Sequence, residues 1–294
     1  MITTQASRAS HPSHARRASA GPAARRPRLV YVLLIALVVM FVLPLLWALS
    51  SSFKHRGDIF TYPPQPLPSP FTLENYTRLL ETQPFWGWFA TSTVVAVVST
   101  AVSVFVCALA GFAFAKYRFR GKRLLFDVMF SSMAVPFAVI VVPLFVMLVK
   151  AGVTNVYFSL IVPWVAPAFG IFMMRQYAEQ AVPDSVLEAA RIDGASEFGL
   201  FTRVVLPLLR PALGALAVWG FLNSYNSFLW PLIVVSDPAQ YTLPLGIQSL
   251  YAAEARQVDL VLAGSVLAAI PSLIMFILLR KQLLDGLTAG AVKS

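Results

Sequence analysis

Hydrophobic residues are gathered into six long runs, and polar residues fill the intervals between them. An α-helix rises about 1.5 Å per residue, so about 20 apolar residues cross the hydrocarbon core of a bilayer. Runs of roughly that length with little or no charge lie at residues 29–52, 89–115, 124–149, 156–174, 208–235 and 260–279. Pro163 and Pro167 in the fourth run are compatible with a span, since neighbouring helices or water can satisfy the carbonyls that they free. The pattern predicts an all-α integral membrane protein with six transmembrane helices.

The first 28 residues precede these runs and show no apolar period. They are rich in Ser, Ala, Pro and Arg, a composition typical of disorder. A basic start before an apolar run also occurs in cleaved signal peptides, but this run is longer than the usual h-region of about 7–15 residues. We therefore expect a disordered basic tail at residues 1–28, a retained first span, and one transmembrane domain over residues 29–294.

The basic residues are distributed unequally between the two sets of loops. If the N-terminus is inside, 18 of the 23 Lys and Arg residues lie in the tail, after the second run, between the fourth and fifth runs, or at the C-terminus. Cytoplasmic loops carry an excess of Lys and Arg. Both termini and the segment between the fourth and fifth runs are thus predicted to be cytoplasmic.

Composition narrows the class of protein further. Only 12% of the residues are charged and 58% are hydrophobic, whereas soluble domains average about 25% charged residues. The net charge of +10 comes from residues scattered between apolar runs, which argues against a nucleic-acid partner. Cys107 is the only cysteine, and His11, His14 and His55 lie outside the apolar runs. An internal disulfide and a cysteine-based metal site are excluded, and neither a histidine metal site nor a Ser-His-Asp centre is expected in the membrane.

The most polar stretch within the apolar part of the chain is "DSVLEAARIDGASEFGLFTRVVLPLLRP", residues 184–211. Ser185 and Glu188 are spaced as a capping box, and Gly194 is expected to end the helix that they begin. A second short helix can start at Ser196, and Leu206–Pro207 marks the entry to the fifth span. The stretch predicts two short helices at the cytoplasmic surface within a loop of residues 178–207.

Such a loop is either a solvated connector or a docking site for a partner. Small residues (Ala189, Ala190, Gly194, Ala195) would let another backbone approach closely, and Glu188 and Asp193 are available for charge pairing. Direct attachment to the fifth span would pass any movement into the membrane. These features favour docking, with a plain connector as the alternative.

The same residues carry a family resemblance. Glu188-Ala189-Ala190, Gly194, Val204 and Leu206-Pro207 resemble, in type and spacing, the coupling-loop signature of ABC-importer permeases. The stretches "WALSSSFK", "GFAFAKYRFRGKRLLF", "NSFLWPL" and "DGLTAGAVKS" are similar to the carbohydrate branch, in particular to the second membrane subunit of maltose-like transporters. The resemblance runs from about residue 30 to the end. It departs at Thr91-Ser92 and at Tyr225, of which the second change could affect substrate preference.

The resemblance implies a type I importer fold in a bacterial inner or plasma membrane, with a second permease subunit, two cytoplasmic ATPase subunits and an extracytoplasmic solute-binding protein as partners. It places Glu188, Ala189, Ala190, Asp193, Gly194 and Ala195 against the ATPase, and brings the tail to the same partner through Thr288, Gly290 and Lys293. A frayed tail is the alternative. The chain has no G-x-x-x-x-G-K-[ST] phosphate loop. We therefore expect no enzyme activity and no cofactor of its own, with ATP and Mg²⁺ held by the partner.

The fifth run contains five consecutive polar side chains at residues 223–227. Polar groups in hydrocarbon face a partner helix or water, so this cluster is either interhelical glue or part of a solute pathway. Asn223, Tyr225 and Asn226 are the candidates for the pathway, because amide and phenol groups suit sugar hydroxyls. We also predict that Pro231 kinks this helix.

Rival functions are distinguishable from this one. An ion-gradient transporter or channel commonly places ionisable residues at mid-membrane, and the centres of these six runs have none. A membrane scaffold would not need the polar cluster. Within importers, a glycerophosphate, amino-acid or peptide permease stays open alongside a sugar or polyol permease.

Overall fold

The computed structural model describes residues 28–153, 155–252 and 256–289, and side chains within residues 30–282 of that range. The described part is mainly helical and contains no strand. In its first half lie α1 (Arg28–Ser51), η1 (Arg56–Asp58), α2 (Glu74–Thr82), α3 (Phe85–Lys116), α4 (Lys122–Ser132), α5 (Phe137–Lys150), α6 (Val156–Ile161) and η2 (Val162–Trp164). In its second half lie α7 (Ala168–Ala181), α8 (Asp184–Ile192), α9 (Glu197–Leu200), the π-helical turn η3 (Phe201–Val205), α10 (Leu206–Leu208), α11 (Arg210–Tyr225), α12 (Leu229–Val234), η4 (Pro238–Gln240), α13 (Leu243–Ala252) and α14 (Val258–Ala289).

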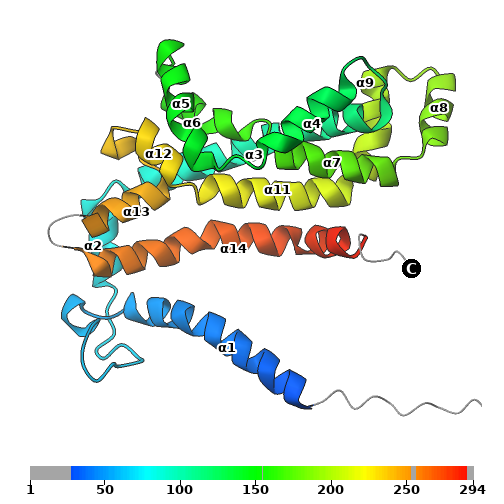
Figure 1. Cartoon of the computed structure of the whole chain (residues 1–294). Helices are drawn as coiled ribbons and strands as arrows, with labels where there is room; N and C mark the ends of the chain where they lie inside the picture. Colours follow the sequence, from blue (N-terminus) through cyan, green and yellow to red (C-terminus); the bar gives the residue numbers. More distant parts are fainter. Residues whose placement is uncertain (1–27, 154, 253–255, 290–294) are drawn as a thin grey trace, which may run out of the picture. The chain divides into compact units, whose positions relative to one another are not determined.

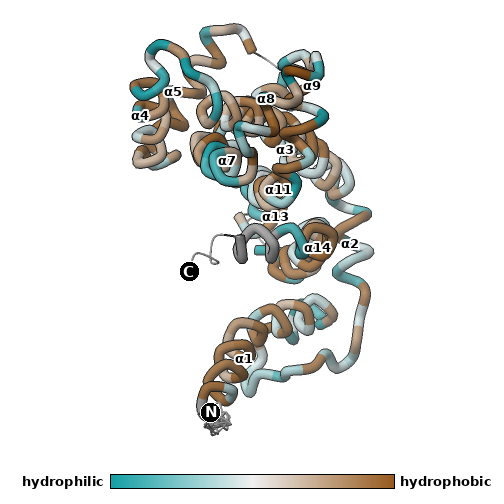
Figure 2. The backbone as a smooth tube through the Cα atoms, turned by 90° about the vertical axis from the view of Figure 1, so that its right-hand side faces the viewer, coloured by the Kyte–Doolittle hydropathy of each residue, from teal (hydrophilic) through white to brown (hydrophobic). Residues whose placement is uncertain are grey.

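The chain divides into two compact units, residues 1–46 and 47–294. The described part of the first unit is α1 up to Leu46, an apolar helix whose side chains are almost all exposed. In the second unit α7 and α11 pack against α3, and α14 packs against α11 (Figure 1). Hydrophobic residues follow the lengths of α1 and α14 (Figure 2).

Among the described residues, three helices are apolar and long enough to cross a bilayer alone: Val30–Ser51, Phe85–Lys116 and Val258–Gln282. They correspond to the first, second and sixth predicted runs, and the last two extend beyond the predicted bounds. Up to six spans result if each of three bent helix pairs counts as one span. The prediction of three further continuous helices is therefore wrong, and the six-span count stays a prediction.

The third and fourth runs are broken at prolines. In the third run α4 and α5 meet at 108°, with Pro136 at the N-cap of α5. In the fourth run, η2 separates α6 from α7 and the bend is 43°, with Pro167 at the N-cap of α7. Proline removes a backbone donor and disfavours helical geometry in the residue before it.

The fifth run also differs from the prediction of one helix over residues 208–235. An 82° bend at Leu209 separates the Glu197–Leu208 helices from α11, which ends at Tyr225. The predicted kink at Pro231 is replaced by this earlier end, after which α12 begins at Leu229. Asn and Ser side chains compete for backbone hydrogen bonds, and Pro231 cannot donate to the carbonyl of Ser227, so the helix does not continue.

Helices α3 and α7 pack closely against each other. A Cβ on Gly111 would lie 2.6 Å from the Met174 Cβ, and one on Gly170 would lie 2.7 Å from the Cys107 Sγ. Real Cβ atoms do not approach so closely, so glycine is required at both positions. Such small residues let membrane helices pack backbone to backbone.

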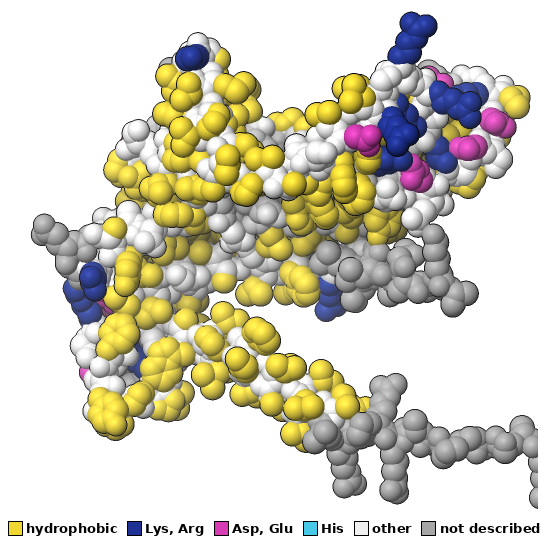
Figure 3. All heavy atoms as spheres, viewed as in Figure 1, with side chains coloured by type: hydrophobic (Ala, Val, Ile, Leu, Met, Phe, Trp, Pro, Cys, Tyr) yellow, Lys and Arg dark blue, Asp and Glu magenta, His cyan; other side chains and the backbone are white. Residues whose placement is uncertain are grey.

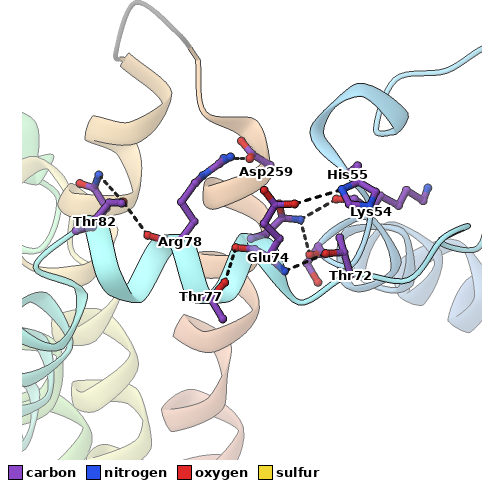
Figure 4. Close-up of polar contacts among 11 residues, drawn as sticks. Lys54, His55, Thr72, Glu74, Thr77, Arg78, Thr82 and Asp259 are labelled. Carbon is purple, nitrogen blue, oxygen red and sulfur yellow. Dashed lines mark hydrogen bonds and ion pairs between the residues drawn. The ribbon is translucent and has the colours of Figure 1, made fainter.

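Polar contacts hold α2 to its surroundings (Figure 4). The Arg78 side chain forms an ion pair with Asp259, which is fully buried at the start of α14. The Asn75 amide donates to the carbonyls of Ser52 and Lys54, both at 2.8 Å. This corner is held by specific polar bonds, in contrast to the largely apolar packing of α3, α7 and α11.

Candidate functional site

The predicted coupling stretch forms a defined unit, here called the 184–205 segment, made of α8, α9 and η3. Figure 1 shows α8 and α9 at one end of the second unit, beyond α7. Helix α8 has an acidic residue, Asp184, in its first turn and a basic one, Arg191, in its last, as the helix dipole favours. The predicted capping box at Ser185 and Glu188 was wrong. Helix α8 begins at Asp184, so its N-cap residue is Pro183, and no side-chain hydrogen bond caps this end of the helix.

Helix α8 faces the protein with one side only. Leu187 is 3% exposed and belongs to the core formed by α3, α7, η3 and α11, against which Ala190 and Ala195 also pack. Glu188 and Ala189 are exposed on the outward side. A movement of α8 would therefore act on the helix bundle through Leu187.

The end of α8 is closed by a Schellman motif. The Gly194 N–H donates to the Arg191 carbonyl, and the Ala195 N–H donates to the Ala190 carbonyl, both at 3.0 Å. Gly194 has a φ of +82°, in the left-handed region where glycine avoids a Cβ penalty. The prediction that Gly194 ends this helix is confirmed.

The second predicted short helix is also present. Ser196 caps α9 by accepting the Gly199 N–H at 3.1 Å. The helix continues through η3, where Phe201 and Val205 are buried, and the Phe201 ring lies 5.9 Å from that of Phe112 on α3. This packing attaches the second half of the segment to α3.

One ion pair and one hydrogen bond fix the segment to the end of α3, and a second ion pair joins α8 to α9. Lys116 pairs with Asp184 at 2.9 Å, and Arg191 pairs with Glu197 at 2.9 Å. The Tyr117 hydroxyl donates to the same Glu197 carboxylate. Residues from α3, α8 and α9 are thus joined in one polar network.

These contacts shift the ionisation of the network. Hydrogen bonding and charge from Lys116 hold the pKa of Asp184 below its usual range, and Arg191 followed by Tyr117 does the same for the pKa of Glu197. Burial and then Glu197 raise the pKa of Tyr117. At neutral pH both carboxylates are therefore ionised and the Tyr117 hydroxyl is a donor.

The outward surface of the segment has acidic side chains without an ion-pair partner among the described residues, and it has exposed apolar side chains. Glu188 and Asp193 form no ion pair with any residue that the structure describes. Ile192 is 85% exposed and Phe198 is 67% exposed. A cavity of about 610 Å³ lies on this segment, with a lining that includes Ala190, Asp193, Gly194, Ala195, Phe198 and Arg203.

The structure brings the six predicted docking residues together on this surface. Glu188, Ala189, Asp193 and Gly194 are exposed, and Ala190 and Ala195 are partly buried. The sequence reasoning missed Ile192 and Phe198. The signal for Ile192 was present, since it falls outside the buried stripe set by Leu187 and Ala190, where an apolar residue has no core to join.

The predicted tail contacts cannot be placed on this surface. Thr288 lies near the end of α14 in a stretch whose side chains are not described, and Gly290 and Lys293 lie outside the described residues. Their contact with a partner stays a prediction.

The polar cluster at residues 223–227 is divided between two environments. The Ser99 hydroxyl donates to the Ser224 hydroxyl at 2.9 Å, so Ser224 forms a hydrogen bond between α3 and α11. Tyr225 is 2% exposed, with its ring stacked on Phe221 at 5.3 Å. Asn223 and Asn226 are exposed. Of the three predicted pathway residues, Tyr225 is thus buried in this structure.

Asn226 lines a cavity of about 530 Å³ bounded by α11, α13 and α14. Its polar lining also includes Gln248, Ser265 and Ser272, and its apolar lining includes Ile247 and Phe276. None of its lining residues in the described part of the chain is ionisable. Neutral amides and hydroxyls beside an apolar wall suit a neutral, hydroxyl-rich ligand. The sequence reasoning missed Gln248, Ser265 and Ser272, which are separated from Asn226 along the chain and meet it only in the folded protein.

Long apolar helices, bent helix pairs and a polar segment anchored at one end define a multi-pass helical membrane protein. Residues 104–283 match the family described as binding-protein-dependent transport system inner membrane component, and the chain belongs to this family. It is therefore a membrane component of the permease class.

Relatives cover most of the chain. It is 34% identical over 262 residues to the arabinooligosaccharides transport system permease protein AraQ of Halalkalibacterium halodurans, covering 88% of this chain and 93% of that protein. It is 34% identical over 209 residues to the lactose transport system permease protein LacG of Rhizobium radiobacter, covering 71% and 74%. It is 32% identical over 267 residues to the diacetylchitobiose uptake system permease protein DasC of Streptomyces coelicolor, covering 88% and 94%.

A solved structure shares the fold. The structure is similar to a chain of a bacterial ABC transporter involved in the import of the acidic polysaccharide alginate, with a TM-score of 0.76 at 22% identity over 86% of this chain and 95% of that chain. This likeness shows that the two chains share a fold.

Proposed function

We propose that this chain is one of two membrane subunits of an ATP-driven importer for a neutral oligosaccharide, and that the 184–205 segment docks on a separate ATPase. The observation that carries the proposal is the outward face of α8. Glu188 and the exposed Ile192 lie on a helix whose other side is packed into the bundle through Leu187.

Force can pass from this face into the membrane by two routes. Closure of the ATPase pair on ATP moves α8, and Leu187 transmits the movement to the core shared by α3 and α7. The second route runs through α9 and η3 to α11, because these elements follow one another without a loop except at the bend at Leu209. The ATPase binds ATP and Mg²⁺ and hydrolyses the ATP, and this chain transmits the resulting movement.

The class of substrate is supported by two lines of evidence. The relatives named above belong to systems for arabinooligosaccharides, lactose and diacetylchitobiose, which are neutral sugars. The cavity beside Asn226 is lined without an ionisable group. Both favour a neutral sugar over a glycerophosphate, amino acid or peptide.

The orientation and the remaining partners belong to the same proposal. The segment faces the cytoplasm together with both termini, since 18 of the 23 basic residues then lie on the inner side. An extracytoplasmic binding protein delivers the sugar, and a second permease subunit completes the pathway. Family membership supports a binding protein, and a rival ion-gradient transporter would not need one.

The test is pull-down of the ATPase through this chain from membranes in which all subunits are co-expressed. Glu188→Lys reverses a charge placed at the interface, so the amount of co-purified ATPase should fall roughly tenfold or more. Glu81→Lys, an exposed acidic residue on α2, is the matched control and should leave it unchanged. Normal recovery of the ATPase with Glu188→Lys and with Ile192→Glu would refute docking through α8.

A further inference from the structure

A second charged cavity lies apart from the 184–205 segment, where the turn between α3 and α4 meets α7. Its volume is about 630 Å³, and its charged lining is Lys122, Arg123 and Arg175 with one acid, Asp127. Figure 3 shows Lys and Arg side chains gathered at the end of the second unit where α8 and α9 lie. The cavity therefore has an excess of positive charge that the proposed docking does not use.

Two of the cations are held in place by the protein. The Arg175 guanidinium lies 3.9 Å from the centre of the Phe126 ring and donates to Glu179 at 2.9 Å. The Lys122 ammonium donates to the Tyr117 carbonyl at 3.0 Å. Groups fixed before binding lose less entropy when a ligand arrives.

The third cation is exposed and loosely paired. The Arg123 side chain is 96% exposed, and its contact with Asp127 is 3.7 Å, which is too long for a hydrogen bond. Exposed pairs of this kind contribute little stability. Arg123 is thus available to an anion at almost no cost to the fold.

The cavity continues into an apolar surface on α4. Leu124 lines it and is 69% exposed, and Leu125 and Val128 on the same helix are also exposed. The Phe119 ring also lines the cavity and is exposed as well. A ligand that fits this surface has an anionic group and a hydrocarbon part joined together.

We propose that this cavity binds the phosphate headgroup of an anionic phospholipid, with the acyl chains lying along Leu124, Leu125 and Val128 of α4. Basic residues at the ends of spans lie at the depth of lipid headgroups, where they attract anionic lipid. The dipole of α4, which begins beside the cavity at Lys122, adds to the positive potential. The bound lipid would hold the turn at Tyr117–Gly121, and through Tyr117 it would stabilise Glu197 in the 184–205 segment.

The experiment measures binding of phosphatidylglycerol to the full-length chain in a neutral detergent by native mass spectrometry, with phosphatidylcholine and inorganic phosphate as the other probes. The Lys122→Gln/Arg123→Gln double variant should weaken phosphatidylglycerol binding roughly 30-fold, since each basic residue near a headgroup strengthens binding about fivefold. Lys122→Arg/Arg123→Lys keeps both charges and should retain binding. Arg210→Gln removes an exposed arginine outside the cavity and should have no effect.

Three results would overturn the proposal. Equal phosphatidylglycerol binding by the wild type and the double glutamine variant would show that the cavity is not the site. An equal loss with Arg210→Gln, or displacement of the lipid by millimolar inorganic phosphate, would point to diffuse surface charge or to a free-phosphate site. Unchanged lipid binding with loss of co-purified ATPase would assign these cations to a protein interface.

Discussion

Lys116, the last residue of α3, forms an ion pair at 2.9 Å with Asp184, the first residue of α8. The pair joins α3 to the segment that we propose to dock on the ATPase. Lys116 is mostly buried and Asp184 is mostly exposed. The contact can therefore guide the position of α8 while leaving its outer face free.

The first prediction concerns this pair. Lys116→Asp should weaken the attachment of α8 and lower the ATPase activity that the binding protein stimulates. The combination Lys116→Asp/Asp184→Lys should restore a large part of it, because the attraction between the two positions is regained. ATP hydrolysis stimulated by the binding protein in proteoliposomes measures both the loss in the single variant and the recovery in the double variant. A double variant no better than Lys116→Asp would show that the pair has no role in coupling.

The second prediction concerns pH. The folded-state pKa values of Asp184 and Glu197 are depressed below ordinary values of 3.8 and 4.5. Depressed acidic pKa values stabilise the folded state above the ordinary pKa, and this contribution is lost as pH falls through the folded value. Hydrogen exchange of the 184–205 segment should therefore show constant protection between pH 6 and pH 8, after correction for the intrinsic rate, and protection should fall only below about pH 4. A transition near pH 6 would contradict the assigned ion pairs.

The third prediction concerns Gly194. Its φ of +82° disfavours a side chain although open space surrounds it. Gly194→Val should destabilise the end of α8 by about 1–2 kcal/mol, which raises hydrogen exchange around residues 190–197 about tenfold. Gly194→Asn should have a smaller effect, since asparagine tolerates the left-handed region.

Gly57→Val is the matched control for Gly194. Gly57 also has open space where a Cβ would lie, but its φ is not positive. Valine there should leave exchange in residues 190–197 unchanged. Equal exchange in Gly194→Val and wild type would contradict the requirement for glycine at the helix end.

The fourth prediction concerns the cavity between α11, α13 and α14. Asn226→Ala and Gln248→Ala should each raise the KM for sugar uptake roughly fivefold, since a neutral hydrogen bond contributes about 1 kcal/mol. Tyr225→Phe should leave uptake unchanged, because the side chain is buried and its hydroxyl has no partner among the described residues. Uptake kinetics with the natural sugar provide the measurement. An effect of Tyr225→Phe as large as that of Asn226→Ala would place the pathway elsewhere.

The sequence was sufficient to locate the apolar helices and the helix end at Gly194, because both depend on residues close together in the chain. The 108° bend at Pro136 and the end of α11 at Tyr225 were missed. In both places the average hydropathy of the whole run stayed high across a local break. Hydropathy measures only average composition, so it does not detect the loss of individual backbone hydrogen bonds.

The polar network and the cavity beside Asn226 were not predictable from local pattern. Lys116 and Asp184 are 68 positions apart, and Tyr117 and Glu197 are 80 positions apart. Their pairing depends on how α3 and α7 pack, which in turn depends on the close contacts at Gly111 and Gly170. Sequence spacing gives the residues of a helix face, but it does not give the partner of that face.

Solvent protection of Ile192 by the ATPase tests the central claim most directly. In a Cys107→Ser background, Ile192→Cys provides a single exposed thiol, since Cys107 is the only natural cysteine. Maleimide should label it rapidly in the detergent-solubilised chain alone and at least tenfold more slowly in the complex with the ATPase, whereas a thiol from Gln240→Cys should be labelled equally in both. Equal labelling of Ile192→Cys with and without the bound ATPase would contradict the account.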